Sequence, residues 1–438
     1  MLDETSWALL RRLTRWLDQF KICFGHRAQV VSLRQYVEGL LGDSARKSMQ
    51  AMLARVTEPE SYQTFQHFIT HAPWEAEPVW RRLRAVVPER HGILILDETS
   101  FPKQGTHSVA VARQYCGALG KVANCQVAVT VALWTGVRAW LLGATLYLPT
   151  AWADDAARRA QARVPARVRF QEKWRLALTL LRRVRAAGIQ ITAVVGDAEY
   201  GDNSTLRQAL HRWRLPYALG ISGDVTLFRG TPTLQRQPDA PPPRNRRGGW
   251  PDHTPLAVRT FAQTLPATAW RRVQWRNGTN DPWEAECAAI RVTPATDWRH
   301  RRLAPEVWLL CERGLGPTGR SKQYLVNLPR GTTLPRIVRL AHQRWAIEQQ
   351  YQDLKDELGF DHFEGRSYPG WEHHVVISAV AYAFLQKERL QPRPGPLLTF
   401  PQVRAMTQEV FTGLLFASRP RYLEWMHQAR QWLLQLRI

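Results

Sequence analysis

The stretch GILILDETSF, residues 92–101, decides the fold class, because an unbroken apolar run ends in two acidic residues. Such a run is typical of a strand that is buried on both faces and ends at the edge of a central sheet. The same pattern recurs in ITAVVGDAEYG, residues 191–201. Asp97 and Asp197 therefore each follow a buried strand, and we expect both at the sheet edge where ligands bind. Either aspartate alone could instead form a turn or cap a helix.

The segments around these two stretches complete an α/β pattern. Three further stretches have the composition of strands: HSVAVARQY (107–115), CQVAVTVALW (125–134) and PYALGIS (216–222). Two regions are typical of helices: the basic residues 152–188, and STLRQALHRW (204–213) with Ser204 as its expected cap. This order of elements predicts a mixed β-sheet flanked by helices.

The rest of the chain predicts further domains around this sheet. Residues 1–88 have apolar residues at helical spacing, whereas residues 229–255 are rich in Pro, Gly and Arg and predict a flexible basic loop. A long helix is expected from Pro335 to about Leu358, ended by Gly359. The predicted domains are a helical N-terminal domain that binds DNA (1–88), a catalytic α/β domain (89–221 and 326–395), a β-rich insertion with the basic loop (222–325), and a helical C-terminal tail (396–438).

The charge balance points to a nucleic-acid partner. The chain has 438 residues with 60 Lys and Arg against 37 Asp and Glu, a formal net charge of +23. Residues 1–90 contain 13 basic and 10 acidic residues, so +3 of this charge lies there and +20 lies downstream. Most of the excess is arginine, whose planar guanidinium binds phosphate through two N–H groups at once. We therefore expect an anionic partner, most often a nucleic acid.

Other classes of protein are not favoured. The longest apolar run, Val375 to Leu385, is too short for a spanning helix, and the N-terminus has acidic residues where a signal peptide is basic. The five cysteines are scattered and form no CxxC pair, which indicates reduced thiols rather than disulfides or a zinc site. We expect a cytoplasmic protein with no membrane partner.

A third carboxylate candidate lies on the long helix. In AHQRWAIEQQYQDLKDELG, Glu348 follows Arg344 by four residues and precedes Lys355 by seven, so the three share one helical stripe. This spacing alone would also fit a surface ladder of ion pairs. Because Trp345 and Ile347 indicate a substantially buried helix, we expect a buried Glu348 that needs partners or a metal.

Asp97, Asp197 and Glu348 all have carboxylate side chains, which are typical ligands of divalent metal ions. Two Asp and one Glu offer hard oxygen ligands, which suit Mg²⁺ or Mn²⁺, and a pair of such ions serves phosphodiester displacement. Arg344 and Lys355 would then contact phosphate beside the metals. The chain has no Gly-rich phosphate loop and no Ser or Cys nucleophile arrangement, so nucleotide hydrolysis and acyl transfer are not supported.

Several long segments resemble bacterial insertion-sequence DDE transposases, in the branch with a β-strand insertion before the last acid. They are YVEGLLGDSARKS, DETSFPKQGTHSVAVARQYCGALGKVANCQVAVTVAL, YLPTAW, GDAEYG and RWAIEQQYQDLKDELGFDHFEGRSYPGW, and the resemblance spans roughly residues 30–390. It implies an RNase H-like fold and cut-and-paste transposition of double-stranded DNA by a bacterial protein associated with the nucleoid. Because two element ends must be held together, we also expect a dimer on DNA. It also implies a metal-binding catalytic triad of Asp97, Asp197 and Glu348.

The resemblance implies further contacts and one departure. Related sequences have a Tyr where this chain has Ala341, and His342 or Tyr351 would have to replace its hydroxyl. Relatives hold a flipped base on an aromatic residue of the insertion, so the candidates for base stacking are Trp250, Trp270, Trp275 and Trp283, although each could equally be core. Independently of the resemblance, Lys103 and Arg113 follow the first acid and are expected to contact the DNA backbone, and Arg244, Arg246 and Arg247 are expected to form part of a diffuse electrostatic track for it.

Alternatives stay open for the site and for the function. Glu98 and Glu199, beside the two aspartates, are interpreted as secondary, and a different register would bring in Asp202, Asp353 or Glu357. An inactivated or domesticated DNA-binding relative is one alternative function, and an RNase H-like nuclease without strand transfer is another.

Overall fold

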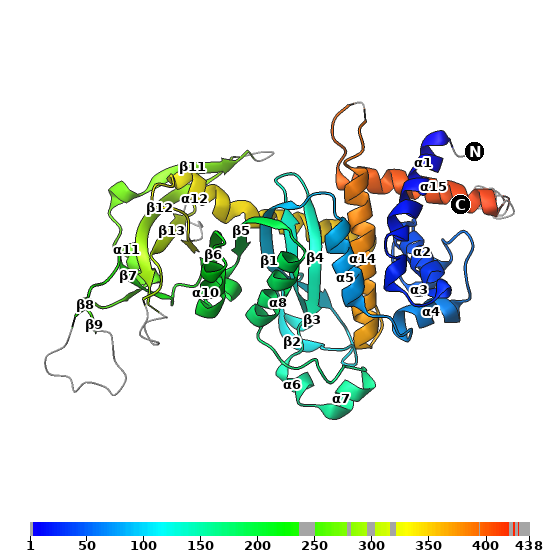
Figure 1. Ribbon diagram of the computed structural model, residues 1–438, viewed down its shortest axis with the longest axis horizontal. Helices are drawn as coiled ribbons and strands as arrows, with labels where there is room; N and C mark the ends of the chain where they lie inside the picture. The colour runs from blue at the N-terminus through cyan, green and yellow to red at the C-terminus, as the bar shows by residue number, and fades with distance from the viewer. Residues whose placement is uncertain are drawn as a thin grey trace, which may run out of the picture.

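The computed structural model describes residues 3–235, 250–277, 282–295, 303–315, 321–393 and 395–419, together with Glu424 and Gln428. In this part of the chain one large mixed sheet runs through the molecule in the order β10-β7-β12-β13-β14-β6-β5-β1-β3-β2, with β4 on β3 and β11 on β12. Figure 1 shows its central strands between the N-terminal helices and a β-rich end.

The central strands are β1 (His91–Pro102), β2 (Ala112–Cys116), β3 (Lys121–Trp134), β4 (Ala139–Leu146), β5 (Gln190–Gly196) and β6 (Tyr217–Ile221). β1 pairs antiparallel with β3 and parallel with β5, and β5 pairs parallel with β6. Leu94, Ile95 and Leu96 are fully buried, as the apolar run in β1 predicts. The predicted mixed α/β sheet of RNase H-like type is therefore confirmed.

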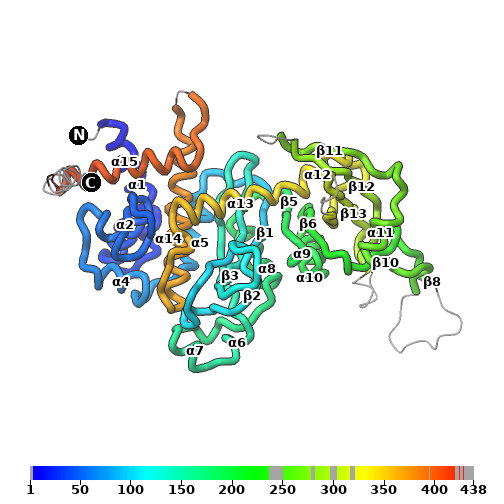
Figure 2. Tube along the Cα trace, turned by 180° about the vertical axis from the view of Figure 1, so that it is seen from behind, coloured from blue at the N-terminus to red at the C-terminus, as the bar shows by residue number. Residues whose placement is uncertain are grey.

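Helices cover both faces of these strands. The helices that follow β4 are α6 (Thr150–Ala153), α7 (Ala156–Gln161), α8 (Lys173–Ala186), α9 (Ala198–Gly201) and α10 (Ser204–Arg212). The long helix predicted from Pro335 is divided into α12 (Leu334–Ala341), a 3-10 turn (His342–Arg344), α13 (Trp345–Gln352) and a π-helical turn (Asp353–Glu357). Figure 2 shows α12 and α13 running from the β-rich end to the centre of the molecule. Gly359 ends this run with φ +61°, as predicted.

The β-rich segment continues the same sheet rather than forming a separate one. Its elements are β7 (Thr226–Arg229), β8 (Leu234–Gln235), β9 (Trp250–Pro251), β10 (Leu256–Ala257), α11 (Val258–Gln263), a 3-10 turn (Ala267–Ala269), β11 (Arg271–Arg276), β12 (Trp283–Pro294), β13 (Val307–Arg313) and β14 (Ser321–Val326). β14 pairs antiparallel with β6, so backbone hydrogen bonds join this segment to the central strands. Among the described residues of this segment, only β8 and β9 form a sheet of their own.

The N-terminal helices pack around an apolar helix near the end of the chain. They are α1 (Glu4–Asp18), the 3-10 turn Lys21–Cys23, α2 (Arg27–Leu41), α3 (Met49–Leu53), α4 (Tyr62–Thr70) and α5 (Ala76–Val86), and the chain closes with α14 (Tyr368–Glu388) and α15 (Phe400–Ser418). α14 is buried along nearly its whole length and contacts α2, α4, α5 and β4. Among the described residues, no helix is both long and apolar enough to cross a membrane.

Two local predictions were wrong, and one strand was missed. β2 begins at Ala112 rather than 107, because the preceding loop is held by Val109 N–H donating to Arg366 O and by Gln126 donating to Val109 O. Asn203, not Ser204, caps α10 by accepting from Leu206 N–H. β4 was not predicted at all, although its residues are almost entirely buried.

Candidate active site

The parallel pairing of β1 and β5 places the first two acids at one sheet edge. Ile95 is the register partner of Val195, and Asp97 and Asp197 each lie two residues further along. Asp97 is 6% exposed, and its Oδ1 accepts from the Glu98 N–H at 2.8 Å. Asp197 caps α9, and its Oδ1 accepts from the Glu199 N–H at 3.1 Å. The two acids therefore come together as expected.

The negative charges of Asp97 and Asp197 at this edge repel each other. Burial raises the pKa of Asp97 to about 6, Arg344 opposes this shift, and the negative charge of Asp197 adds to it. Two carboxylates close enough to repel each other favour a positive charge between or beside them. This is the electrostatic condition under which a divalent cation binds strongly.

Arg344 connects the first acid to the third. Its Nη1 donates to Asp97 Oδ2 at 2.5 Å and its Nη2 donates to Glu348 Oε1 at 3.4 Å. Glu348 lies on α13 with 68% of its side chain exposed, so the expectation of a buried Glu348 was wrong. The helix is buried through Ala346 and Ile347, which lie on a different side of α13 from Glu348.

The acids match a divalent metal in their chemistry, although Arg344 occupies part of the space. Within the described residues, no three acidic, His or Cys side chains already lie close enough to hold an ion. Asp97 and Asp197 supply hard oxygen donors beside each other, and Glu348 supplies a third across the Arg344 guanidinium. A cation shared by all three requires this guanidinium to move aside.

The opposite face of β1 carries a second charged pair. Neighbouring residues of a strand point to opposite faces, and Glu98 accordingly points away from Arg344 and accepts from Lys173 Nζ at 2.7 Å. Lys173 begins α8, so α8 and α13 cover the two faces at the level of Asp97. The position of Lys173 was missed, because nothing in its basic surroundings distinguishes it from nine other cations between Arg158 and Arg185.

The other predicted phosphate contacts are placed differently. Lys355 Nζ donates to Ser100 O at 3.0 Å, and Lys103 Nζ donates to Phe363 O at 2.6 Å. Both ammonium groups are thus hydrogen-bonded to backbone carbonyls, and burial lowers the pKa of each. Arg113 is exposed on β2. Arg244, Arg246 and Arg247 lie outside the described residues.

Both candidates for the missing Tyr hydroxyl already have partners. Tyr351 lies near Asp97, and its hydroxyl is 2.5 Å from Thr130 Oγ1, whose own hydroxyl donates to Asp97 O. His342 Nε2 is 2.7 Å from Glu312 Oε2, on the side of the insertion. Of these two, only Tyr351 lies beside the acids.

The alternative acids are engaged elsewhere. Asp202 Oδ1 accepts from the Ser222 N–H at 2.8 Å, and buried Asp353 accepts from the Gln349 amide at 3.1 Å. Glu357 lies in the π-helical turn, where its carbonyl accepts from Arg404.

The four tryptophan candidates differ in their surroundings. Trp275 stacks on His342 with ring centroids 3.7 Å apart, and Arg313 lies 4.3 Å over Trp270. Trp283 is 50% exposed, and Arg276 lies 5.8 Å from its ring and 3.6 Å from that of Trp345, the first residue of α13. Trp250 is 38% exposed on β9, at the far end of the β-rich segment in Figure 1. Trp283 is therefore the exposed candidate beside α13.

Comparison with known proteins gives two matches. The family model described as DDE superfamily endonuclease matches residues 19–282. A probable transposase for insertion sequence element IS701 from Microchaete diplosiphon is 32% identical over 171 residues, which are 38% of this chain and 41% of that relative. The alignment therefore spans less than half of the relative's length.

Proposed function

The chain belongs to the DDE superfamily endonucleases, and we propose that it is the transposase of an insertion sequence, which cuts element ends and joins them to target DNA. The observation that carries this proposal is the register of β1 and β5, which brings Asp97 and Asp197 to one sheet edge beside Arg344 and Glu348. The transposase relative supports strand transfer as the outcome.

We propose that Asp97, Asp197 and Glu348 hold Mg²⁺ or Mn²⁺, as two ions. Divalent cations bound there would activate water and stabilise the leaving 3′ oxygen. In the first step water attacks the phosphorus at the element end and the bond to the 3′ oxygen breaks, leaving a 3′-OH. In the second step this hydroxyl attacks a target phosphodiester in line, so one P–O bond forms as another breaks and no energy source is consumed.

The chain's own residues position the DNA for both steps. Arg344 is the guanidinium nearest to the reacting edge, and we propose that it transfers from Asp97 to the scissile phosphate. Lys355 donates to Ser100 O, three residues beyond Asp97 in β1, and we propose that Lys355 and Lys103 add positive charge along the DNA path beyond the acids. Trp283 is the candidate for stacking an unpaired base, since its ring is exposed near α13.

The proposed partners follow from the same chemistry. The substrate is double-stranded DNA carrying the terminal repeats of the element, and the net charge of +23 supports this class of partner. Two ends must be held together, so we propose a dimer on DNA. We also retain the division into an N-terminal DNA-binding domain, a catalytic domain, an insertion and a C-terminal tail as part of this proposal.

The test is cleavage of a plasmid that carries the element's ends, with Mg²⁺, by the full chain and by Glu348→Gln. The substitution keeps size and hydrogen bonding but removes the charge that holds a metal. Cleavage should fall by more than about 100-fold with DNA binding retained, since changes to groups that merely orient metal ligands cost about 10–100-fold. Glu357→Gln is the matched control, because Glu357 is nine residues further along the same helical run and should tolerate the change.

Each other outcome points to a different conclusion. If both variants lose cleavage equally, or if only Glu357→Gln loses it, the assignment of Glu348 as the third acid is wrong. Cleavage without joining of the 3′ ends would identify a nuclease without strand transfer. Specific end binding with no cleavage by the unaltered chain would identify a DNA-binding relative.

A further inference from the structure

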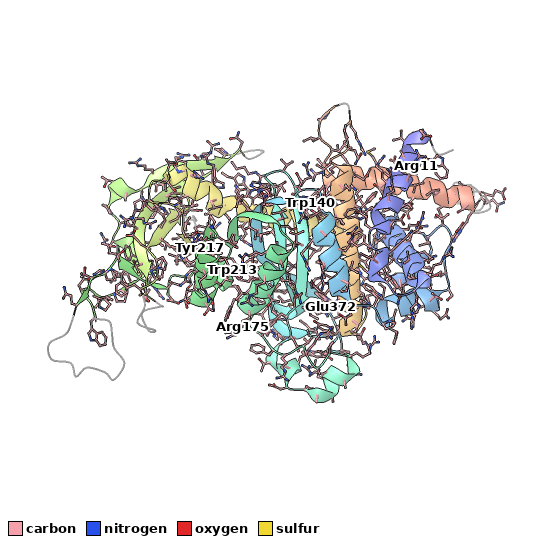
Figure 3. The ribbon with its side chains drawn as sticks, in the orientation of Figure 1. Arg11, Trp140, Arg175, Trp213, Tyr217 and Glu372 are labelled. Atoms are coloured by element: carbon pink, nitrogen blue, oxygen red, sulfur yellow. The ribbon has the colours of Figure 1, made fainter. Side chains whose placement is uncertain are left out.

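Helices α8 and α10 lie against each other and present a row of exposed arginines. We call this row the α8–α10 arginine surface; it consists of Arg175, Arg182, Arg185, Arg212 and Arg214. Between the helices lies a groove of about 770 Å³, whose lining includes Arg175, Arg182 and Arg212. Figure 3 labels Arg175 and Trp213, which lie on this part of the molecule.

The charge of this surface is largely uncompensated. Arg175 pairs with Glu172 at 3.2 Å, whereas within the described residues no ion pair includes the other four arginines. Arg183, on the same helix, pairs with Glu77 at 3.0 Å and is therefore not counted. Five arginines and one glutamate leave a formal charge of +4 on a single face, which favours a polyanion.

Two of the arginines are held in place before any partner binds. The Arg175 guanidinium lies 4.5 Å above the Trp174 ring, and that of Arg185 lies 4.4 Å above the Trp213 ring. A guanidinium lying on an indole loses rotational freedom, while the N–H groups at its edge stay available to donate. Less entropy is then lost when these groups bind phosphate.

The surface begins at the level of Asp97, on the face of β1 opposite to Arg344. Lys173, the first residue of α8, pairs at 2.7 Å with Glu98, which follows Asp97 in β1. From there α8 extends for 14 residues, which is about 21 Å at 1.5 Å per residue. Duplex DNA has one phosphate per strand every 3.4 Å, so this length corresponds to about six base pairs.

We propose that the α8–α10 arginine surface binds the phosphate backbone of duplex DNA that continues away from the scissile bond. The inference rests on the proposed function and names a surface on which the substrate lies. Because only backbone is contacted, the surface adds affinity without base preference. Arg182 and Arg212 line the groove and carry no carboxylate partner among the described residues, so each contacts one phosphate.

The experiment measures the affinity of the full chain for a 30-base-pair duplex of arbitrary sequence between 50 and 200 mM salt. Glu348→Gln is the background, so that no cleavage occurs during the measurement. Removing two phosphate contacts with Arg182→Gln/Arg212→Gln should reduce the slope of log affinity against log salt by about 1.8. Over this fourfold range of salt the parent should therefore lose about 12-fold more affinity than the variant.

Two matched variants make the result specific. Arg259→Gln/Arg272→Gln removes the same charge from exposed arginines that pair with Asp224 and Glu284, and it should leave the slope unchanged. Arg182→Lys/Arg212→Lys keeps the charge and should retain the parental slope. If both glutamine pairs reduce the slope equally, the arginines contribute only to the overall positive potential. If Arg182→Gln/Arg212→Gln does not change the slope, the α8–α10 arginine surface does not bind DNA. Either result overturns the proposal.

If Arg182→Lys/Arg212→Lys reduces the slope as much as the glutamine pair does, the substitutions act through disturbed packing, and this result would also overturn the proposal. The proposed function is judged separately, by plasmid cleavage with the unaltered chain. Binding through this surface in a chain that does not cleave would leave the surface assigned and the transposase function refuted.

Discussion

His374 lies at the centre of the packing between α14 and the N-terminal helices and is fully buried. Its Nδ1 is 2.9 Å from the Tyr36 hydroxyl, and its Nε2 is 3.2 Å from both Gly359 O and Phe360 O. A neutral imidazole satisfies all of these contacts, by accepting at Nδ1 and donating at Nε2. Burial lowers the pKa of His374 to about 4, against the pull of the two carbonyls.

This lowered pKa makes the stability of the protein depend on pH. As the pH falls below 6.5 the unfolded chain takes up a proton that the folded chain refuses until about pH 4, so stability is lost across that interval. At pH 4.5 the loss from this one residue is about 2.5 kcal/mol. Above pH 6.5 both states are neutral at this position and His374 adds no pH dependence.

His374→Gln separates this effect from the other titrating groups. The amide can donate to the same carbonyls but does not titrate, so at pH 7 the variant should be less stable by about 1–2 kcal/mol. At pH 4.5 the order should reverse, because only the unaltered protein has lost a further 2.5 kcal/mol or so. Urea unfolding followed by tryptophan fluorescence at both pH values measures the two differences.

The exposed His91 provides the control, and His91→Gln should show no reversal. If His374→Gln were less stable than the parent by the same amount at pH 7 and pH 4.5, His374 would be titrating alike in the folded and unfolded chains. The argument from burial and hydrogen bonding would then be refuted.

Two further predictions concern DNA. Trp283→Ala should leave unfolding nearly unchanged, because half of the side chain is exposed, and should weaken binding of a duplex with one unpaired base by about 1–3 kcal/mol. Trp275→Ala, which removes the ring stacked on His342, should instead destabilise the fold; the same loss of binding without destabilisation would contradict this assignment. Deleting residues 236–249, which include Arg244, Arg246 and Arg247, should reduce affinity and flatten its salt dependence while β8 and β9 remain in the chain. If the deletion leaves the affinity unchanged at every salt concentration between 50 and 200 mM, residues 236–249 do not bind DNA.

The amino-acid sequence was sufficient to predict the elements that depend on a local sequence pattern. The apolar runs before Asp97 and Asp197 form central strands because such segments are stable only when both faces are covered. Gly359 ends the helical run of α12 and α13 because it adopts a positive φ without a steric cost. The fold class and the family followed from patterns of this kind.

Only the tertiary structure decided the contacts between distant residues. Arg344 lies between Asp97 and Glu348 because strand and helix, 247 residues apart in the chain, meet across one face of the sheet. Lys103 and Lys355 donate to carbonyls 260 and 255 residues away, so their ammonium groups are directed by the fold and not by their neighbours. Spacing along a helix indicates which residues share a stripe, but whether that stripe is buried, as for Ile347, or exposed, as for Glu348, depends on what packs against it.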